Sequence, residues 1–363
     1  MARFVPVWSG FVSRWRISSR RLVVAGLLIA AVIWHPFLER HLRPALFISE
    51  SFPQVPLKPL QLVSTEPLHQ TLQLGPSTGG VVADLYVPTQ RFGSVPAHSR
   101  PALVLAMGVK TSPEDRPLLL ELARTLARLG CVVLWSRSQS LDDGVSLPEE
   151  PDTFVSAVRY LQSHELVDPQ RISLLGFSTG ASTGFVAASR PEIADNVRSL
   201  IFFGGYFDIH DYLLSLATAS MSVNGHSDPW PPSEAARGQV QEILANTHSL
   251  GLLRAFDAAT PDEAAAQLED APKAEIDELR RFSPSFNSNG FRGRLFILHD
   301  TGDPLVPYVE SAKLYQAMSS RVETTYVVTS LFEHVQPKKE LTWETVGHLL
   351  KLYAFLDEAL HTL

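Results

Sequence analysis

Short apolar runs recur along most of the chain, and amphipathic segments separate them. The runs are continuously apolar, which is expected of parallel strands that are covered on both faces. They are "PALVLAMG" at 101–108, "CVVLWS" at 131–136, "RISLLGFS" at 171–178, "VRSLIFFGG" at 197–205 and "GRLFILHD" at 293–300. An early strand and a late one are predicted by "GGVVADLYVP" at 79–88 and "ETTYVVTS" at 323–330.

The segments between these runs have apolar residues at helical spacing. The segment at 111–130 has a helix start at Ser112, a proline at the first helical position and a stop at Gly130. Further helices are predicted at 152–164, 181–190, 309–318 and 341–360. Because strand–helix units repeat, the predicted fold class is α/β, a mostly parallel sheet with helices on both faces.

One region breaks the alternation. Residues 206–286 lie between two predicted strands but contain no good strand pattern of their own. "TPDEAAAQLED" at 260–270 and "KAEIDELRR" at 273–281 are typical of helices. We therefore expect a mostly helical insertion, placed where a lid would cover the end of the sheet.

The N-terminus has the pattern of a membrane segment. Residues 1–21 carry five arginines and no acidic residue, and residues 22–34, "LVVAGLLIAAVIW", carry no charge. This pattern predicts a signal peptide or signal anchor over 1–38, with its N-terminus in the cytoplasm and the folded domain outside it. No clean small-x-small cleavage site follows, which favours a retained anchor. The alternative is a buried helix of the folded domain.

Two further boundaries follow from composition. Residues 39–79 are rich in proline, serine and leucine and show weak periodicity, so a linker is expected there. The folded domain is then expected over 80–363. The 31 Lys and Arg residues against 38 Asp and Glu give a net charge of −7 and no basic stripe outside the N-terminus. Nucleic acid is therefore not an expected partner.

The only cysteine of the chain, Cys131, lies in the apolar run "GCVVLW". A single cysteine excludes a disulfide within the chain. Its setting resembles a buried strand, so a small buried side chain is expected in place of a nucleophile or a metal ligand.

A serine between two glycines follows one of the apolar runs. "GFSTG" places Gly176, Ser178 and Gly180 in the pattern G-x-S-x-G, between a predicted strand and a predicted helix. In such a turn the serine projects beyond the sheet, and small neighbours are needed because chain segments crowd the turn. The N–H of Thr179 points into the same space at a helix N-terminus, which favours an oxyanion. The segment predicts a nucleophile and half of an oxyanion hole.

A serine hydroxyl needs a base, and the base needs an acid to orient it. "LFILHDTGDPLVP" offers Asp300 and Asp303 directly after a predicted strand, and "SLFEHVQP" offers His334 after the next one. Since parallel strands end at the same edge of a sheet, these side chains are expected near Ser178. His348 is a rival base, but it falls inside a predicted helix, where a surface position is expected.

At these residues the sequence resembles the α/β-hydrolase superfamily, closest to its dienelactone-hydrolase-like, esterase and prolyl-oligopeptidase-like members. "VDPQRISLLGFSTGAS" resembles the nucleophile elbow, "LHDTGDPLVP" the H-G-x-x-D-x-x-V-P loop, and "FEHVQP" the histidine loop. The resemblance covers about residues 80–360, apart from much of the insertion. It implies an α/β-hydrolase fold, with Asp303 in place of Asp300 as the acid.

The sequence departs from that family in three places. Asp300 stands where the family usually has glycine, and Ser178 stands where dienelactone hydrolases proper have cysteine. The lipase-type H-G-G-G stretch is absent, and "AMGVKTS" takes its place. The second oxyanion N–H is therefore expected from Met107, Gly108 or Val109.

The resemblance implies two-step acyl transfer, with Ser178 as nucleophile, His334 as base and Asp303 as acid. A small carboxylic ester is the expected substrate. The alternatives are a peptidase of the prolyl-oligopeptidase-like type and an inactive, membrane-tethered binding protein on a hydrolase scaffold. No cofactor is expected, and the oligomeric state stays open. No metal site is expected either, since three histidines of the insertion lack ligand-like spacing: His210, His226 and His248.

Overall fold

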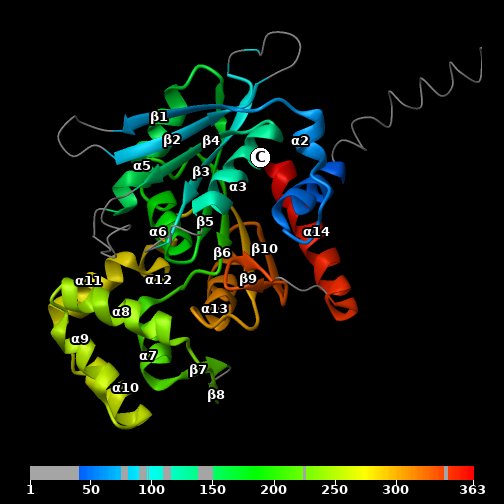
Figure 1. The fold of residues 1–363 in the computed structure, drawn as a ribbon. Coiled ribbons are helices and arrows are strands. Elements are labelled where there is room, and N and C mark those ends of the chain that lie inside the picture. The colour runs from blue at the N-terminus through cyan, green and yellow to red at the C-terminus, as the bar shows by residue number, and fades with distance from the viewer. Residues whose placement is uncertain are drawn as a thin grey trace, which may run out of the picture. The chain divides into compact units, whose positions relative to one another are not determined.

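The computed structural model describes residues 41–74, 81–89, 96, 98–108, 116–137, 150–223, 226–338 and 342–363. The chain divides into two compact units, Met1–Leu42 and Arg43–Leu363, and the second holds the folded domain (Figure 1). The predicted membrane segment at 22–34 lies outside the described residues. Within the part of the chain that is described, no helix combines the length and the apolar character needed to cross a bilayer.

A mixed sheet lies at the centre of the domain. Its strands are β1 (Leu68–Leu74), β2 (Val81–Val87), β3 (Arg100–Ala106), β4 (Val132–Arg137), β5 (Val167–Phe177), β6 (Val197–Phe203), β9 (Arg294–Asp300) and β10 (Thr324–Thr329). Their spatial order among the described residues is β1-β2-β4-β3-β5-β6-β9-β10. β2 pairs antiparallel with β1 and with β4, and all other neighbours pair parallel. The prediction of a mostly parallel sheet is confirmed.

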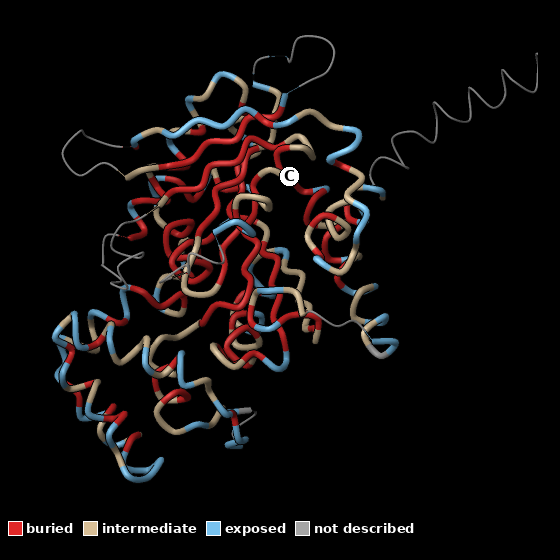
Figure 2. Tube along the Cα trace, in the orientation of Figure 1, coloured by how far each residue is buried: buried red, intermediate tan, exposed pale blue. Residues whose placement is uncertain are grey.

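Helices cover both faces of the sheet, because the central strands are apolar on both faces. These helices are α3 (Arg116–Arg128), α5 (Glu150–Ser163), α6 (Thr179–Ala188), α13 (Val309–Met318) and α14 (Val346–Thr362). In β3, Ala102 and Val104 belong to the buried cluster that includes α5, α6 and α13. The alternate residues Leu103 and Leu105 belong to a second cluster, with α3 and α14. This two-residue period divides the core into two layers, and Figure 2 shows the strands between them as buried.

The stretch expected to be a linker, 39–79, belongs to the folded domain from residue 43 on. Residues 43–51 are helical, α2 spans Pro59–Val63, and β1 forms an edge of the sheet. Phe52 is buried, with its ring 5.9 Å from that of Phe332 between centroids. The linker prediction is wrong here, because residues that pack singly against a distant segment leave no periodic signal in the sequence.

The segment between β6 and β9 forms the helical insertion. It comprises α7 (Ile209–Thr218), β7 (Ser220–Val223), β8 (His226–Pro229), α8 (Glu234–Asn246), α9 (Leu250–Arg254), α10 (Pro261–Glu269), α11 (Lys273–Phe282) and α12 (Pro284–Asn287). Its apolar side chains form a third buried cluster. The hairpin β7–β8 contradicts the expectation of no strand. Its second strand is "HSDP", exposed at all four residues, so it has no apolar alternation to detect.

Candidate active site

Ser178 lies on the sharp turn between β5 and α6. Its backbone has φ 54° and ψ −135°, which is rare for a residue with a side chain. The flanking glycines permit close packing of the turn. A Cβ on Gly180 would lie 2.3 Å from the carbonyl oxygen of Ala106, and one on Gly176 would lie 2.4 Å from the Cα of Ala181. The turn therefore has the crowding that the glycine pattern predicted.

Two of the candidate oxyanion donors lie beside Ser178. Thr179 is the first residue of α6, so its N–H precedes the hydrogen-bond ladder of the helix. Gly108 follows β3, and a Cβ added there would lie 3.1 Å from Ser178 Cβ and 3.5 Å from its Oγ. Val109 lies outside the described residues. Met107 contacts the turn through its backbone, which packs against Gly180.

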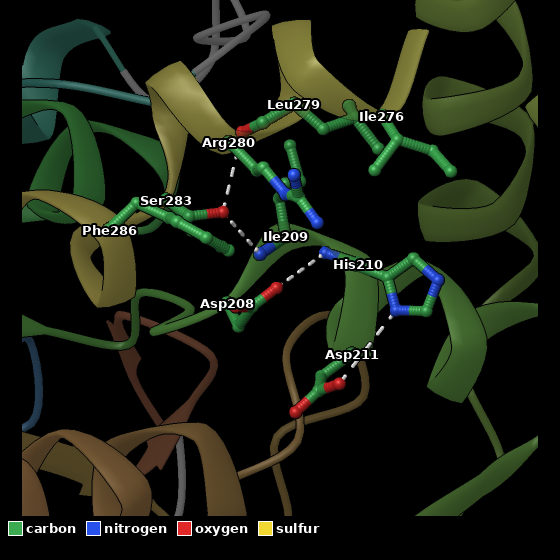
Figure 3. Close-up of a pocket in the computed structure, with 9 residues that line it drawn as sticks. All are labelled: Asp208, Ile209, His210, Asp211, Ile276, Leu279, Arg280, Ser283 and Phe286. Atoms are coloured by element: carbon green, nitrogen blue, oxygen red, sulfur yellow. Dashed lines mark hydrogen bonds and ion pairs between the residues drawn. The ribbon is translucent and has the colours of Figure 1, made fainter. Parts of the chain in front are cut away.

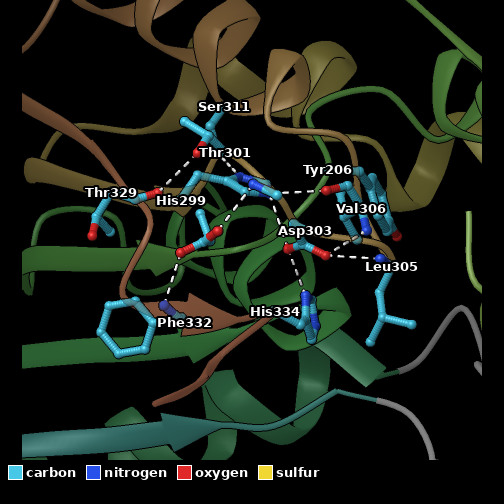
Figure 4. Close-up of polar contacts among 12 residues, drawn as sticks. Tyr206, His299, Thr301, Asp303, Leu305, Val306, Ser311, Thr329, Phe332 and His334 are labelled. Atoms are coloured by element: carbon cyan, nitrogen blue, oxygen red, sulfur yellow. Dashed lines mark hydrogen bonds and ion pairs between the residues drawn. The ribbon is translucent and has the colours of Figure 1, made fainter. Parts of the chain in front are cut away.

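Asp303 and His334 are joined by a hydrogen bond. Asp303 follows β9, and His334 lies in the turn between β11 (Phe332–Glu333) and β12 (Gln336–Pro337). His334 Nδ1 lies 2.7 Å from Asp303 Oδ2, and both residues are buried (Figure 4). Because an ionised carboxylate only accepts hydrogen bonds, the proton is on Nδ1, and in the neutral ring Nε2 is left to accept another.

The turn after β6 brings the serine and the histidine to the same place. A Cβ on Gly204 would lie 3.4 Å from His334 Cε1, and one on Gly205 would lie 2.9 Å from the Ser178 carbonyl oxygen. The Ser178 N–H also donates to the Phe203 carbonyl at 2.8 Å. Among these described side chains, no hydrogen bond joins Ser178 Oγ to His334. The acid–base pair is thus assembled, and the serine lies beside it without being bonded to it.

Four donors surround the Asp303 carboxylate. Oδ1 accepts the N–H groups of Leu305 at 2.8 Å and Val306 at 3.0 Å, while Oδ2 faces His334 and, at 3.2 Å, His299 Nε2. Burial by itself raises the pKa of Asp303. The charge of His334 and the hydrogen bonds from His299 and His334 outweigh it, so the pKa of Asp303 lies well below its usual range. The carboxylate is therefore ionised at neutral pH.

His299 is a site residue that the sequence reasoning missed. It is fully buried, with Nε2 at 3.0 Å from the Val306 carbonyl and Nδ1 at 2.6 Å from Ser311 Oγ. A carbonyl only accepts, so Nε2 carries the proton, and Nδ1 of the neutral ring accepts from Ser311. The signal was available, since His299 is the first residue of the loop motif that distinguishes Asp303 from Asp300.

Asp300 contacts the histidine loop without reaching His334. Its Oδ2 accepts the Phe332 N–H at 2.8 Å, and its Oδ1 accepts the Gly302 N–H at 2.9 Å. Lys338 Nζ lies 3.6 Å from Oδ1. The carboxylate at the position where the resembled family usually has glycine therefore anchors the loop that carries the histidine. Asp303 is the carboxylate that the structure places on the base.

The other histidines considered in the sequence lie on other elements than this pair. His348 is in the first turn of α14, His210 is in α7 beside Asp211, and His226 is on β8. His248 follows α8 with a positive φ of 56°. Across the described ranges of the chain, no group of three or more His, Cys, Asp or Glu side chains is arranged to hold a metal ion.

Cys131 is buried directly before β4, as the sequence predicted. Burial raises the pKa of its thiol to about 11. The thiol is therefore protonated at neutral pH, which makes it a poor nucleophile.

A pocket of about 250 Å³ lies in the insertion, between α7 and α11 (Figure 3). Its apolar wall includes Ile276 and Leu279, and its polar rim includes His210, Asp211 and Arg280. None of the three predicted triad residues lines it. The pocket is therefore a feature of the insertion and not of the candidate active site.

Comparison with known proteins places the fold. No family model matches the chain, and no curated protein matches it. Solved structures do match. An acylaminoacyl peptidase in complex with Z-Gly-Gly-Phe-chloromethyl ketone has a TM-score of 0.51 at 13% identity, over 81% of this chain and 41% of its own. The dipeptidyl peptidase 4 of Porphyromonas gingivalis has a TM-score of 0.50 at 14% identity, over 81% and 36%.

A puromycin hydrolase has a TM-score of 0.52 at 16% identity, over 80% of this chain and 39% of its own. These neighbours are members of the α/β-hydrolase superfamily, so the likeness shows that the chain has the α/β-hydrolase fold that the sequence predicted. The chain spans less than half of the length of each of these proteins.

Proposed function

We propose that the protein is a serine hydrolase that transfers an acyl group to water. The observation that carries this proposal is the buried Asp303–His334 pair, 2.7 Å apart and packed against the same turn as the strained Ser178. Serine, acid and histidine follow in the chain order of α/β-hydrolases. Ser178 follows β5, Asp303 follows β9, and His334 lies in the turn between β11 and β12, so three distant segments would supply the triad.

The geometry supports a two-step mechanism. His334 Nε2 takes the proton from Ser178 as its Oγ attacks a carbonyl carbon, and Asp303 holds the ring and stabilises its cation. The Thr179 N–H, with one from Gly108 or Val109, binds the oxyanion. Rotation of the serine side chain toward Nε2 on substrate binding completes the triad, because catalytic hydrogen bonds often tighten only in the bound complex. Water then releases the acyl group.

A small carboxylic ester is our first choice of substrate, and a short peptide is the second. The peptide alternative draws support from the fold neighbours, which include an acylaminoacyl peptidase and a dipeptidyl peptidase 4. The same triad can cleave an ester bond or a peptide bond, since both reactions pass through a tetrahedral oxyanion intermediate. A panel of p-nitrophenyl esters and peptide p-nitroanilides separates the two, by which class gives the higher kcat/KM.

A fluorophosphonate tests the serine directly, before any substrate is known. The expected result is a stoichiometric adduct that maps to Ser178 and is lost in His334→Ala. Ser189→Ala, at the other end of α6, is the matched control and keeps the adduct. A folded protein that gives no adduct contradicts the proposal and favours a binding protein on a hydrolase scaffold.

We also propose that residues 22–34 anchor the chain in a membrane, with the folded domain on the extracytoplasmic side. The support is the arginine-rich flank and the uncharged apolar run of the sequence. Recovery of the full chain in the membrane fraction, resistant to high salt and released by detergent, is the expected result. Recovery in the cytosol without detergent contradicts it.

A further inference from the structure

Three consecutive carbonyls of the loop that carries the acid accept hydrogen bonds from the insertion. We call residues 303–306 the acid loop. Trp230 Nε1 donates to the Asp303 carbonyl at 2.9 Å, the Ser233 N–H donates to the Pro304 carbonyl at 2.8 Å, and Tyr212 Oη donates to the Leu305 carbonyl at 2.9 Å. The three donors come from α7, from the segment after β8 and from the start of α8. Separate parts of the insertion therefore fasten the same short stretch.

Apolar packing joins the same two regions. Val306 is 2% exposed and belongs to the buried cluster of the insertion, together with Trp230 and Tyr212. The Tyr212 ring stacks on Tyr206, with centroids 5.5 Å apart and planes 5° apart. The Trp230 hydrogen bond is buried, so it is costly to break, because an unpaired carbonyl would remain out of water. The Tyr212 hydrogen bond is partly buried.

A partly buried ion pair continues the contact beyond the acid loop. Glu310, on α13, is fully buried and accepts the N–H groups of Phe207 at 3.0 Å and Asp208 at 2.9 Å. Lys313 Nζ bridges Glu310 at 2.6 Å and Asp211 of α7 at 2.7 Å. The start of the insertion is thus tied to the helix that follows the acid loop.

We infer that the insertion is a fixed clamp that positions the acid, and that Trp230 and Tyr212 are positioning residues for Asp303. The inference rests on the proposed serine hydrolase function. The side chain of Asp303 is held by the two histidines and by its own loop, but its main chain is held by the insertion. Movement of the part of the insertion that carries Tyr212, Trp230 and Ser233 away from the sheet would displace the carboxylate from His334. This part therefore cannot open as a free lid while the triad stays assembled.

The test removes one donor at a time from the full chain in detergent micelles. Trp230→Phe and Tyr212→Phe keep an aromatic ring in place and delete the N–H or the O–H. Trp135→Phe in β4 and Tyr86→Phe in β2 are the matched controls, because both residues are also buried but lie in the sheet. The first readout is the rate of fluorophosphonate labelling across pH. The second is the far-downfield proton resonance of His334 Nδ1–H, which reports the bond to Asp303 without requiring catalysis.

We expect each clamp variant to label about tenfold more slowly and the double variant up to about 10²-fold more slowly, the scale of a misplacement near 1 Å. The pH profile of labelling should also change, because Asp303 no longer holds the imidazole in one orientation. The His334 resonance should broaden or shift. The controls should match the wild type in all three.

The outcomes separate this inference from the proposed function. Clamp variants that label at the wild-type rate with an unchanged His334 resonance overturn the clamp and leave the hydrolase proposal intact. The clamp is also overturned if labelling slows only in proportion to the loss of folded protein, while the pH profile and the His334 resonance stay unchanged. A wild-type protein that never labels overturns the hydrolase proposal. In that case a His334 Nδ1–H resonance that is lost in Trp230→Phe and Tyr212→Phe, but kept in the controls, still supports the clamp.

Discussion

The two halves of the candidate site are built in different ways. The nucleophile half is local: Ser178 is set by a few neighbouring residues, and Gly180 presses against the end of β3. The acid–base half is assembled from distant segments, since Asp303 and His334 are 31 residues apart and depend on the insertion and the histidine loop. Backbone crowding fixes the first half, and side-chain hydrogen bonds fix the second. Substitutions should therefore damage the two halves by different mechanisms.

Removal of the nucleophile should have the largest effect on activity. Ser178→Ala is expected to lower turnover on the order of 10⁶-fold, because the reacting atom is lost. The melting temperature should stay about the same, since Ser178 Oγ makes no hydrogen bond to the base. Turnover on the best ester, with differential scanning calorimetry alongside, checks both. Unaltered turnover would refute the assignment of Ser178, and Ser189→Ala controls for the loss of a serine from α6.

A comparison of the two aspartates tests the acid–base half. Asp303→Asn should cost on the order of 10⁴-fold in kcat, because the amide favours the wrong tautomer of His334. Asp300→Asn should cost much less activity but about 1–3 kcal/mol of stability, since Asp300 anchors the buried Phe332 N–H. Kinetics and urea denaturation of both variants give the comparison. If Asp300→Asn lowers kcat more than Asp303→Asn, the acid is misassigned.

A glycine substitution tests whether backbone crowding fixes the nucleophile half. Gly180→Ala should destabilise the protein by about 1–3 kcal/mol, because the new Cβ would lie 2.3 Å from the Ala106 oxygen and part β3 from the serine turn. Gly238→Ala in α8 is the matched control, since a Cβ there meets nothing within 4 Å. It should stabilise the protein by up to about 1 kcal/mol through helix propensity. Equal effects of the two would contradict the crowding argument.

The difference between the two halves also explains what the sequence could predict. The serine turn was predictable residue by residue, because Gly176, Ser178 and Gly180 are encoded next to one another between a strand and a helix. Asp303 and His334 were predictable as candidates through their strand ends and motif context. The fold class followed from the alternation of apolar runs and amphipathic segments.

The supports of the acid–base half were not predictable in this way. The hydrogen bonds of Trp230 and Tyr212 to the acid loop join segments more than 70 residues apart, at 73 and 93 residues. No pattern in the sequence marks such pairs. For the same reason the sequence did not predict the packing of Phe52 on Phe332 or the hydrogen bond from the Phe332 N–H to Asp300. Residues that act through tertiary contacts show their function only when the fold is known.

The smallest predicted effect concerns acid stability at the edge of the acid–base half. The pKa of Asp211 is lowered from 3.8 to about 2. The hydrogen bond with His210 lowers it, burial opposes this effect, and Lys313 lowers it further. His210 Nδ1 lies 3.9 Å away and Lys313 Nζ 2.7 Å away, so we assign most of the stabilisation to the lysine. A lowered folded-state pKa gives stability that is present above the ordinary value and is lost as the pH falls toward 2.

Asp211 is 45% exposed, so solvent screening limits this contribution to less than about 1 kcal/mol. Asp211→Asn should therefore lose a few tenths of a kcal/mol at pH 6 and flatten the fall in stability between pH 4 and pH 2, as measured by urea denaturation. Asp228→Asn, on the exposed strand β8, is the control and should leave that fall unchanged. A wild-type slope in Asp211→Asn would mean that Glu310 alone holds Lys313, and that α7 is joined to α13 through the buried carboxylate without help from the exposed one.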